Sequence, residues 1–156
     1  MFGRCCAWGL LLVVASCGRV YAANEQSVVE STLRAYEDAW SHHDAAAAAS
    51  FYYEPTMRVT AGGPVVRAKR KDQEDFFKSF FPGLVKGGYD HSAWESLSIR
   101  LLDPMTAIAS GVTVRYRADG SVFARLGVTY FLYSTPEGWK IFLSSTHEPA
   151  AALRFE

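Results

Sequence analysis

Two side chains stand where they could carry acid–base chemistry in a folded core, and the first is His147. It follows Trp139, Ile141, Leu143 and Ser145 at every second position. In one regular strand these five residues share a face. An imidazole on that apolar face can act as a base or orient a ligand, whereas a histidine at the core edge would only bond to backbone. Both interpretations stay open.

Glu95 is the second catalytic candidate, because it is the one carboxylate inside a long extended stretch. It alternates with His91, Leu97 and Ile99. Facing inward, it would be a candidate base. Facing outward, it would be an ordinary solvated strand residue, and we favour this orientation.

Arg115 and His91 are candidates for ligand recognition. Arg115 shares a strand face with Thr113 and Arg117. In a pocket, a guanidinium recognises a carboxylate or an enolate through two parallel hydrogen bonds. The alternation nevertheless favours the outer face of the sheet for Arg115. His91 begins its strand and is the weaker candidate for a pocket role.

Aromatic side chains supply the material for an apolar binding surface. The candidates are Tyr36, Trp40, Tyr52 and Tyr130. Each could also serve only in core packing, which is the commoner use of such residues.

A metal or cofactor site is not expected. Adjacent histidines in a helix point in different directions, so His42 and His43 do not form a ligand pair with Asp44. Asp44 is better placed as a helix cap. No glycine-rich phosphate loop or nucleophile motif is present in the sequence.

The first 22 residues have the pattern of a bacterial signal sequence. Arg4 precedes a short apolar run that is too short to span a bilayer. Two cleavage sites compete, one after Ala22 and one before Cys17 in a lipobox-like Val-Ala-Ser-Cys. In the second case Cys17 would be lipidated, and the lipid would be the chain's only membrane attachment. We expect an exported protein of the bacterial cell envelope, lipid-anchored or soluble in the periplasm.

The composition of the 156 residues fits one domain after such a leader. Nearly half of the residues are hydrophobic and 14% are aromatic, which is enough for a core. The formal net charge is zero, and the one basic cluster runs directly into Asp72, Glu74 and Asp75. We read this cluster as the solvated start of a helix, so nucleic acid is not an expected partner. All three cysteines lie in the leader.

Three helices and two kinds of strand must position these side chains. Ser27 to Glu30 fits a capping box that starts a helix ending near Ser41. A thin alanine-rich helix follows over 45–52, and Glu54-Pro55 breaks it. A short strand over 57–61 and a strand stub over 65–66 lead to a third helix over 69–81, bent or ended by Pro82-Gly83.

From Tyr89 the apolar period becomes strand-like. Turn residues separate four long strands, over about 89–102, 106–117, 121–134 and 139–148. Three successive hairpins give an antiparallel meander. We therefore predict an α+β fold, a cone-shaped roll of three helices on a strongly bent, mainly antiparallel sheet.

This layout resembles the nuclear transport factor 2-like superfamily, and specifically an uncharacterised bacterial subfamily of its SnoaL-like members. The resemblance rests on four segments and their spacing, and covers residues 25–148. These segments are 36–40 with the following Asp44 and 51–52, then 107–112, then 115–120, and 138–141. We expect a SnoaL-like domain over 23–149 and a tail over 150–156.

The resemblance implies a conical pocket but does not choose an activity. The leading interpretation is a binding domain for a small, mostly apolar or aromatic ligand, with Tyr36, Trp40 and Tyr52 around the pocket and His147 as its polar group. The alternatives are an isomerase, cyclase or dehydratase using His147 or Glu95, and a protein-interaction module. A homodimer is expected from the resemblance alone.

Overall fold

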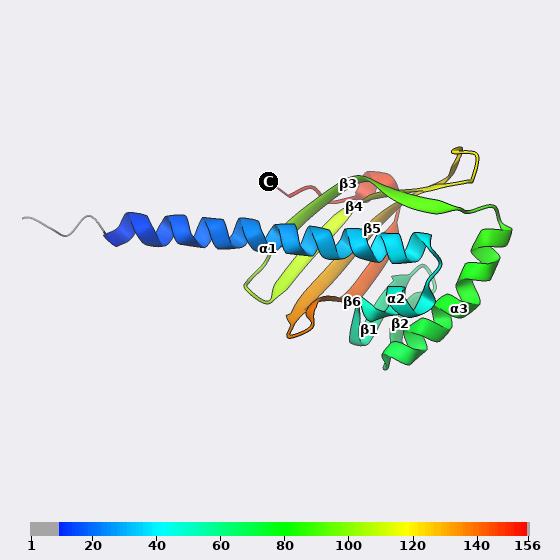
Figure 1. Cartoon of the computed structure of the whole chain (residues 1–156), viewed down its shortest axis with the longest axis horizontal. Helices are drawn as coiled ribbons and strands as arrows, with labels where there is room; N and C mark the ends of the chain where they lie inside the picture. Colours follow the sequence, from blue (N-terminus) through cyan, green and yellow to red (C-terminus); the bar gives the residue numbers. More distant parts are fainter. Residues whose placement is uncertain (1–9, 156) are drawn as a thin grey trace, which may run out of the picture.

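The computed structural model describes residues 10–155, with side chains from residue 24 onward. The helices are α1 (Leu10–Ser41), α2 (Ala45–Ser50) and α3 (Arg70–Lys86) (Figure 1). The strands are β1 (Tyr52–Thr60), β2 (Gly63–Arg67), β3 (His91–Leu101), β4 (Thr106–Tyr116), β5 (Val122–Thr135) and β6 (Gly138–His147), followed by a short 3-10 turn, Pro149–Ala151.

The six strands form one mixed sheet, in the order β2-β1-β6-β5-β4-β3. The strands from β3 to β6 pair antiparallel in succession, which confirms the meander. β1 joins β6 in parallel and carries β2 on its outer edge. In Figure 1, α1 crosses one face of this sheet, while α2 and α3 close its β1–β2 end. The α+β prediction is confirmed.

The start of α1 was predicted wrongly. Ser27 lies inside the helix, and its carbonyl accepts a hydrogen bond from Ser31 Oγ. Nothing between residues 20 and 27 breaks a helix, so the capping-box residues are ordinary interior positions. The helix includes residues of the predicted leader, whereas Met1–Gly9 lie outside the described residues. No helix of the described part is long and apolar enough to cross a membrane.

The other two helices also differ at their ends. Asp44 caps α2 as predicted, accepting from the Ala47 N–H at 2.9 Å. However, α2 ends at Ser50, and Pro55 lies within β1, not at a helix end. α3 runs through Pro82 to Lys86 and ends at Gly87, so the proline does not stop it.

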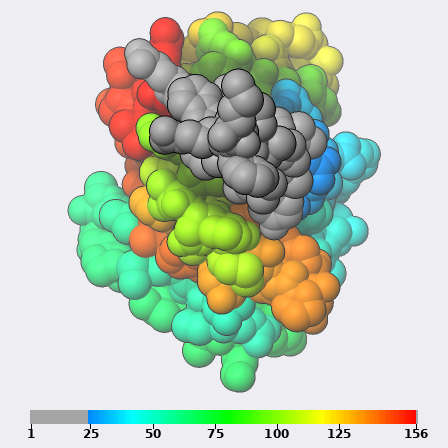
Figure 2. Space-filling model, turned by 90° about the vertical axis from the view of Figure 1, so that its left-hand side faces the viewer, coloured from blue at the N-terminus to red at the C-terminus, as the bar shows by residue number. Residues whose placement is uncertain are grey.

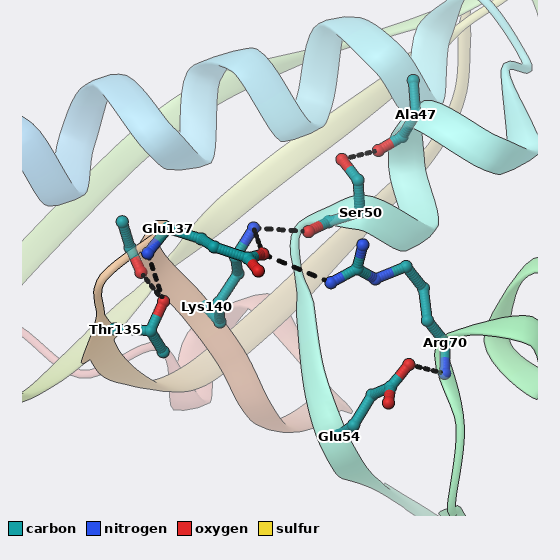
Figure 3. A network of polar contacts seen from close by, with 8 residues as sticks. Ala47, Ser50, Glu54, Arg70, Thr135, Glu137 and Lys140 are labelled. Carbon is teal, nitrogen blue, oxygen red and sulfur yellow. Dashed lines mark hydrogen bonds and ion pairs between the residues drawn. The ribbon is translucent and has the colours of Figure 1, made fainter.

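A surface network joins the ends of these elements (Figure 3). Lys140 Nζ donates to the Ser50 carbonyl at 2.8 Å, and the Arg70 N–H donates to Glu54 Oε1 at 2.6 Å. Glu137 lies between the two cations, 3.4 Å from Arg70 Nη2 and 3.8 Å from Lys140 Nζ. Exposed ion pairs stabilise little individually. Together these contacts hold α2, β1 and the start of α3 to the β5–β6 turn.

The core lies between the sheet and the helices. It combines the apolar face of α1 with Phe77 and Phe81 of α3 and with inward residues of β4, β5 and β6. The alanines of α2 include fully buried Ala48 and Ala49, so this thin helix lies close to its neighbours, as predicted.

Hairpin turns meet at one end of the molecule. Figure 2 shows the β3–β4 turn (yellow-green) beside the β5–β6 turn (orange). The Ser134 N–H donates to the Met105 carbonyl at 2.8 Å across this junction. After β6, the tail crosses the sheet, and the N–H groups of Leu153 and Phe155 donate to Ser110 Oγ and Ser98 Oγ, each at 2.9 Å.

Candidate functional site

A cavity of about 70 Å³ lies between α1, α3 and the sheet and opens to solvent. Side chains of α1, α3, β1, β3, β4, β5 and β6 form its walls. Those that matter below are Tyr36, Glu37, Trp40, Tyr52, Arg58, Gln73, Phe76, Trp94, Thr113, Arg115, Tyr130 and Ser144.

Four predicted aromatic residues meet in this cavity. Tyr36 packs edge-on against Trp40, Tyr52 and Tyr130, with ring centres 5.6–6.2 Å apart. The hydroxyls of Tyr36 and Tyr52 form a 2.9 Å hydrogen bond. Burial raises the pKa of all three tyrosines. They are therefore neutral hydrogen-bonding groups at ordinary pH.

Arg115 lies in the cavity, which corrects our preference for the outer face. Its guanidinium carbon is 5.3 Å from the centre of the Trp40 ring and 5.7 Å from that of Tyr89. Burial lowers the pKa of Arg115, yet a guanidinium keeps its proton at any ordinary pH. Stacking on two aromatic faces offsets part of its lost hydration. This stacking explains how a cation occupies an inward position on β4.

A second arginine, Arg58, lines the same cavity. Arg58 of β1 lies 5.8 Å from the ring centre of Phe76, and Arg67 of β2 lies 4.0 Å from the same ring. Burial, and then the neighbouring charge of Arg58, lower the pKa of Arg67. Arg67 belongs to the basic cluster that precedes Asp72 in the sequence, which we interpreted as the solvated start of a helix. α3 does begin there, at Arg70, but Arg67 turns back toward the cavity wall.

Glu37 is the carboxylate of the cavity, and our sequence analysis missed it. Thr113 Oγ1 donates to Glu37 Oε1 at 2.9 Å. Burial raises the pKa of Glu37. Hydrogen bonds from the Thr113 hydroxyl and from the backbone N–H of Trp94 lower this pKa, but by less. The signal was present on α1. Leu33, Glu37 and Trp40 are spaced four and three residues apart and share the inward face of the helix.

Two buried polar atoms of the cavity wall have no hydrogen-bond partner among the described residues. They are Trp94 Nε1 and Gln73 Oε1. Gln73 is only 3% exposed. A buried polar group without a partner costs about 1–3 kcal/mol. Both side chains belong to the cavity wall, so a ligand could compensate this cost only by contacting them.

His147 lies on the other face of the sheet, so its predicted role in the cone is wrong. Ile141 pairs with Leu132, but Leu143 pairs with the adjacent Phe131, so β6 contains a bulge. One extra residue reverses the facing of every later side chain. Ser144 and Thr146 line the cavity instead of His147.

On that outer face, His147 belongs to a chain of hydrogen bonds. Its Nε2 lies 2.8 Å from Thr129 Oγ1, which lies 2.8 Å from Ser110 Oγ. His147 Nδ1 lies 2.9 Å from the Glu148 carbonyl oxygen. The histidine therefore joins β6 to the start of the tail.

The remaining polar candidates are on the surface. Glu95 is exposed and bonds Arg125 at 2.6 and 2.8 Å, which matches the outward orientation that we favoured and removes it as a base in the cavity. His91 pairs with Asp90 at 2.8 Å and stacks on Tyr116 beside a separate open hollow, so it is not a cavity residue.

The two histidines in the turn after α1 do not form a metal site either. His42 bonds the Asp38 carbonyl, and His43 packs on Phe81 and Tyr89. Across the described residues, no three histidine, cysteine or acidic side chains gather where they could hold a metal. The side chain of Cys17, the predicted lipidation site, lies outside the described ones.

A bent sheet with helices on one face and a polar-lined cone between them defines the class of this domain. The family model described as NTF2-like protein (DUF6841) matches residues 24–149. The chain belongs to this family. The predicted resemblance to the nuclear transport factor 2-like superfamily is thus confirmed.

Solved structures agree on the fold. An NTF2-like protein with a cystatin-like fold from Novosphingobium aromaticivorans is 15% identical, with 90% of each chain covered and a TM-score of 0.69. A ketosteroid isomerase-like protein from Erwinia carotovora atroseptica is 18% identical, covering 78% of this chain and 94% of its own, with a TM-score of 0.59.

A third example, an NTF-2-like protein of unknown function from Shewanella oneidensis, is 18% identical, covers 77% of this chain and 96% of its own, and has a TM-score of 0.63. At these identities the likeness concerns the fold alone. None of the curated proteins matches the chain.

Proposed function

We propose that this domain binds a small organic molecule with an apolar body in the cavity described above. The observation that carries the proposal is the pair of buried, unpartnered atoms, Trp94 Nε1 and Gln73 Oε1, on an aromatic wall. Pockets that recognise small molecules combine apolar walls with a few convergent polar groups. A ligand that accepts a hydrogen bond from Trp94 Nε1 would remove the desolvation cost of that indole N–H.

The size of the cavity limits the ligand. A cavity of ~150 Å³ holds benzene, whereas this one measures about 70 Å³. The buried part of the ligand is therefore a few heavy atoms, and a larger molecule would extend through the open mouth. Small molecules with one polar end fit this space best.

The proposal is tested by thermal-shift and calorimetric titration of the purified full-length chain. The panel would contain short carboxylates, benzoate, the matching neutral amides, medium-chain fatty acids and a steroid. We expect at least one class to stabilise the protein, and Trp40→Phe to weaken its binding. Trp139→Phe is the control, because Trp139 is also a core tryptophan, is more buried than Trp40 and lies outside the cavity wall.

Two results would contradict the proposal. One is stabilisation by no member of the panel. The other is equal loss of binding in the Trp40 and Trp139 variants, which would mean that only general stability matters.

Proton transfer is a second candidate function, and one observation favours it: a partly desolvated carboxylate, Glu37, lines the same cavity as cationic and phenolic donors. A carboxylate with a raised pKa is suited to general base catalysis. Glu37 would take a proton from a carbon next to a carbonyl, and the C–H electron pair would pass to the carbonyl oxygen. Arg115 or a tyrosine hydroxyl would stabilise the resulting enolate.

This candidate is tested by NMR in D₂O with a bound carbonyl compound from the panel. Deuterium should enter its α-carbon with the wild-type chain, and Glu37→Gln should retain binding but stop exchange. Exchange at the same rate in both proteins would exclude Glu37 as the base.

We also propose, from the sequence alone, that the chain is exported to the bacterial cell envelope and forms a homodimer. Mass spectrometry of the protein from membranes would distinguish a lipidated N-terminal Cys17 from cleavage after Ala22. An intact N-terminus in the cytosol would contradict export. Sedimentation of the purified protein tests the dimer, and a monomer at all concentrations would contradict it.

A further inference from the structure

We infer that the ligand of the cavity is a small organic carboxylate, bound through the guanidinium of Arg115, with Arg58 as a second cation of the same cavity wall. This inference rests on the proposed function, because it names the chemical class of the molecule that the cavity would hold.

The first step of the argument is the charge of the cavity wall. Among the described residues that line it, the arginines are Arg58 and Arg115 and the one acidic residue is Glu37. The wall is therefore net positive by one charge when Glu37 is ionised, and by two when it is protonated. Such a wall favours an anion over a neutral or cationic ligand.

The second step is the absence of protein partners for these cations. Arg34, Arg70 and Arg125 each pair with a glutamate on the surface. Between residues 24 and 155, no acidic side chain pairs with Arg58, Arg67 or Arg115, whose contacts are aromatic rings. The arginines that form these ion pairs with glutamates are thus exposed. The half-buried arginines at the cavity form no ion pair with a described acidic side chain.

The third step is mutual repulsion. Burial is the main cause that lowers the pKa of Arg67 and of Arg115, and the charge of Arg58 lowers both further, so Arg58 repels each of the other two cations. Like charges brought together out of water destabilise a fold unless a counter-charge joins them. An anion in the cavity would supply that counter-charge.

The fourth step concerns the shape of the anion. A guanidinium over an aromatic face keeps in-plane N–H donors free, and two of these match the two oxygens of a carboxylate. The aromatic walls suit an apolar or unsaturated body, and Trp94 Nε1 adds one neutral donor. A fully hydrated inorganic anion would gain nothing from such walls.

Calorimetric titration of the full-length chain at low ionic strength tests the inference with matched probes. The carboxylates are crotonate and benzoate, the neutral isosteres are crotonamide and benzamide, and inorganic phosphate is the anion without an apolar body. We expect each carboxylate to bind at least about tenfold more tightly than its amide. Arg115→Met should remove this preference, and Arg115→Lys should retain only part of it.

The control is Arg125→Met, which removes an arginine that is exposed and paired with Glu95 on the surface. It should leave the preference for the carboxylate unchanged. Equal affinity for carboxylate and amide, or tighter binding of phosphate than of benzoate, would overturn the inference while leaving the cavity a binding site. An unchanged preference in Arg115→Met would overturn the assignment to Arg115. Binding of none of the organic probes would overturn the proposed function as well.

Discussion

Neighbouring residues on one turn of α1 have different tasks at the cavity. Tyr36 supplies a neutral hydroxyl bonded to Tyr52, Trp40 supplies an aromatic face for Arg115, and Glu37 supplies a carboxylate. Each is placed by helical spacing rather than by a local motif. The chemistry of the site therefore depends on the orientation of this single helix against β3 and β4.

Glu37 should make stability depend on pH in a recognisable direction. Burial raises the pKa of Glu37 in the folded protein, so the folded state binds more protons than the unfolded state as Glu37 titrates. Its contribution to stability is thus favourable at low pH and is lost as pH rises through the raised pKa. Relative to wild type, Glu37→Gln should gain stability as pH increases from about 4 to 7.

Urea denaturation of both proteins across this pH range measures the effect. Glu30→Gln is the control, because Glu30 lies on the solvent side of the same helix and pairs with Arg34. A stability difference between Glu37→Gln and wild type that is flat with pH, or that changes in the opposite direction, would contradict the burial of Glu37.

At the scale of the elements, the meander, the aromatic faces of the helices and the Asp44 cap could be predicted because each rests on local spacing. The sheet face on which the His147 side chain lies could not be predicted in this way. A bulge at Phe142 reverses the alternation of β6, and nothing in the local sequence marks it. Arg115 was misplaced for a different reason, since its inward position depends on the aromatic rings of other elements. Long-range packing thus decided what the local pattern left open.

Two glycines should respond oppositely to alanine. A Cβ on Gly111 of β4 would lie 2.0 Å from the Ser96 carbonyl oxygen, so the β3 backbone would have to move. Gly111→Ala should cost about 1–3 kcal/mol or more. In α3, a Cβ on Gly83 meets nothing within 4 Å, so Gly83→Ala should stabilise by about 0.5–1 kcal/mol. Thermal denaturation of both variants measures this, and a Gly111→Ala protein as stable as wild type would refute the close β3–β4 approach.

The tail should be held by specific hydroxyl groups on the sheet. Ser110→Ala removes the acceptor of the Leu153 N–H and the bond to Thr129, at a cost of about 1–3 kcal/mol. Amide hydrogen exchange should then accelerate at Leu153. Ser98→Ala should accelerate exchange at Phe155 and leave Leu153 protected. Unchanged exchange at Leu153 in Ser110→Ala would show that the tail is held in another way.

At the scale of the whole molecule, the two faces of the sheet carry different structures. One face meets the helices and encloses a small, net positive cavity, while the other carries the His147–Thr129–Ser110 chain and the tail. Membership of the family explains why the helices cover this face of the sheet. Relatives below 25% identity do not indicate which ligand the cavity binds. The arginines of this particular cavity and the unpartnered Trp94 donor are what point to an organic carboxylate.

The most direct test of this account is an intermolecular NOE experiment with crotonate on the full-length, isotope-labelled chain. We predict cross-peaks from the methyl and vinyl protons of crotonate to the indole proton of Trp94 and to the ring of Tyr130, both of which line the cavity. Those cross-peaks would place a ligand in the cone. Cross-peaks confined to the surface hollow beside Asp90 and His91, or none at saturating crotonate, would contradict the claim that the cone is the binding site.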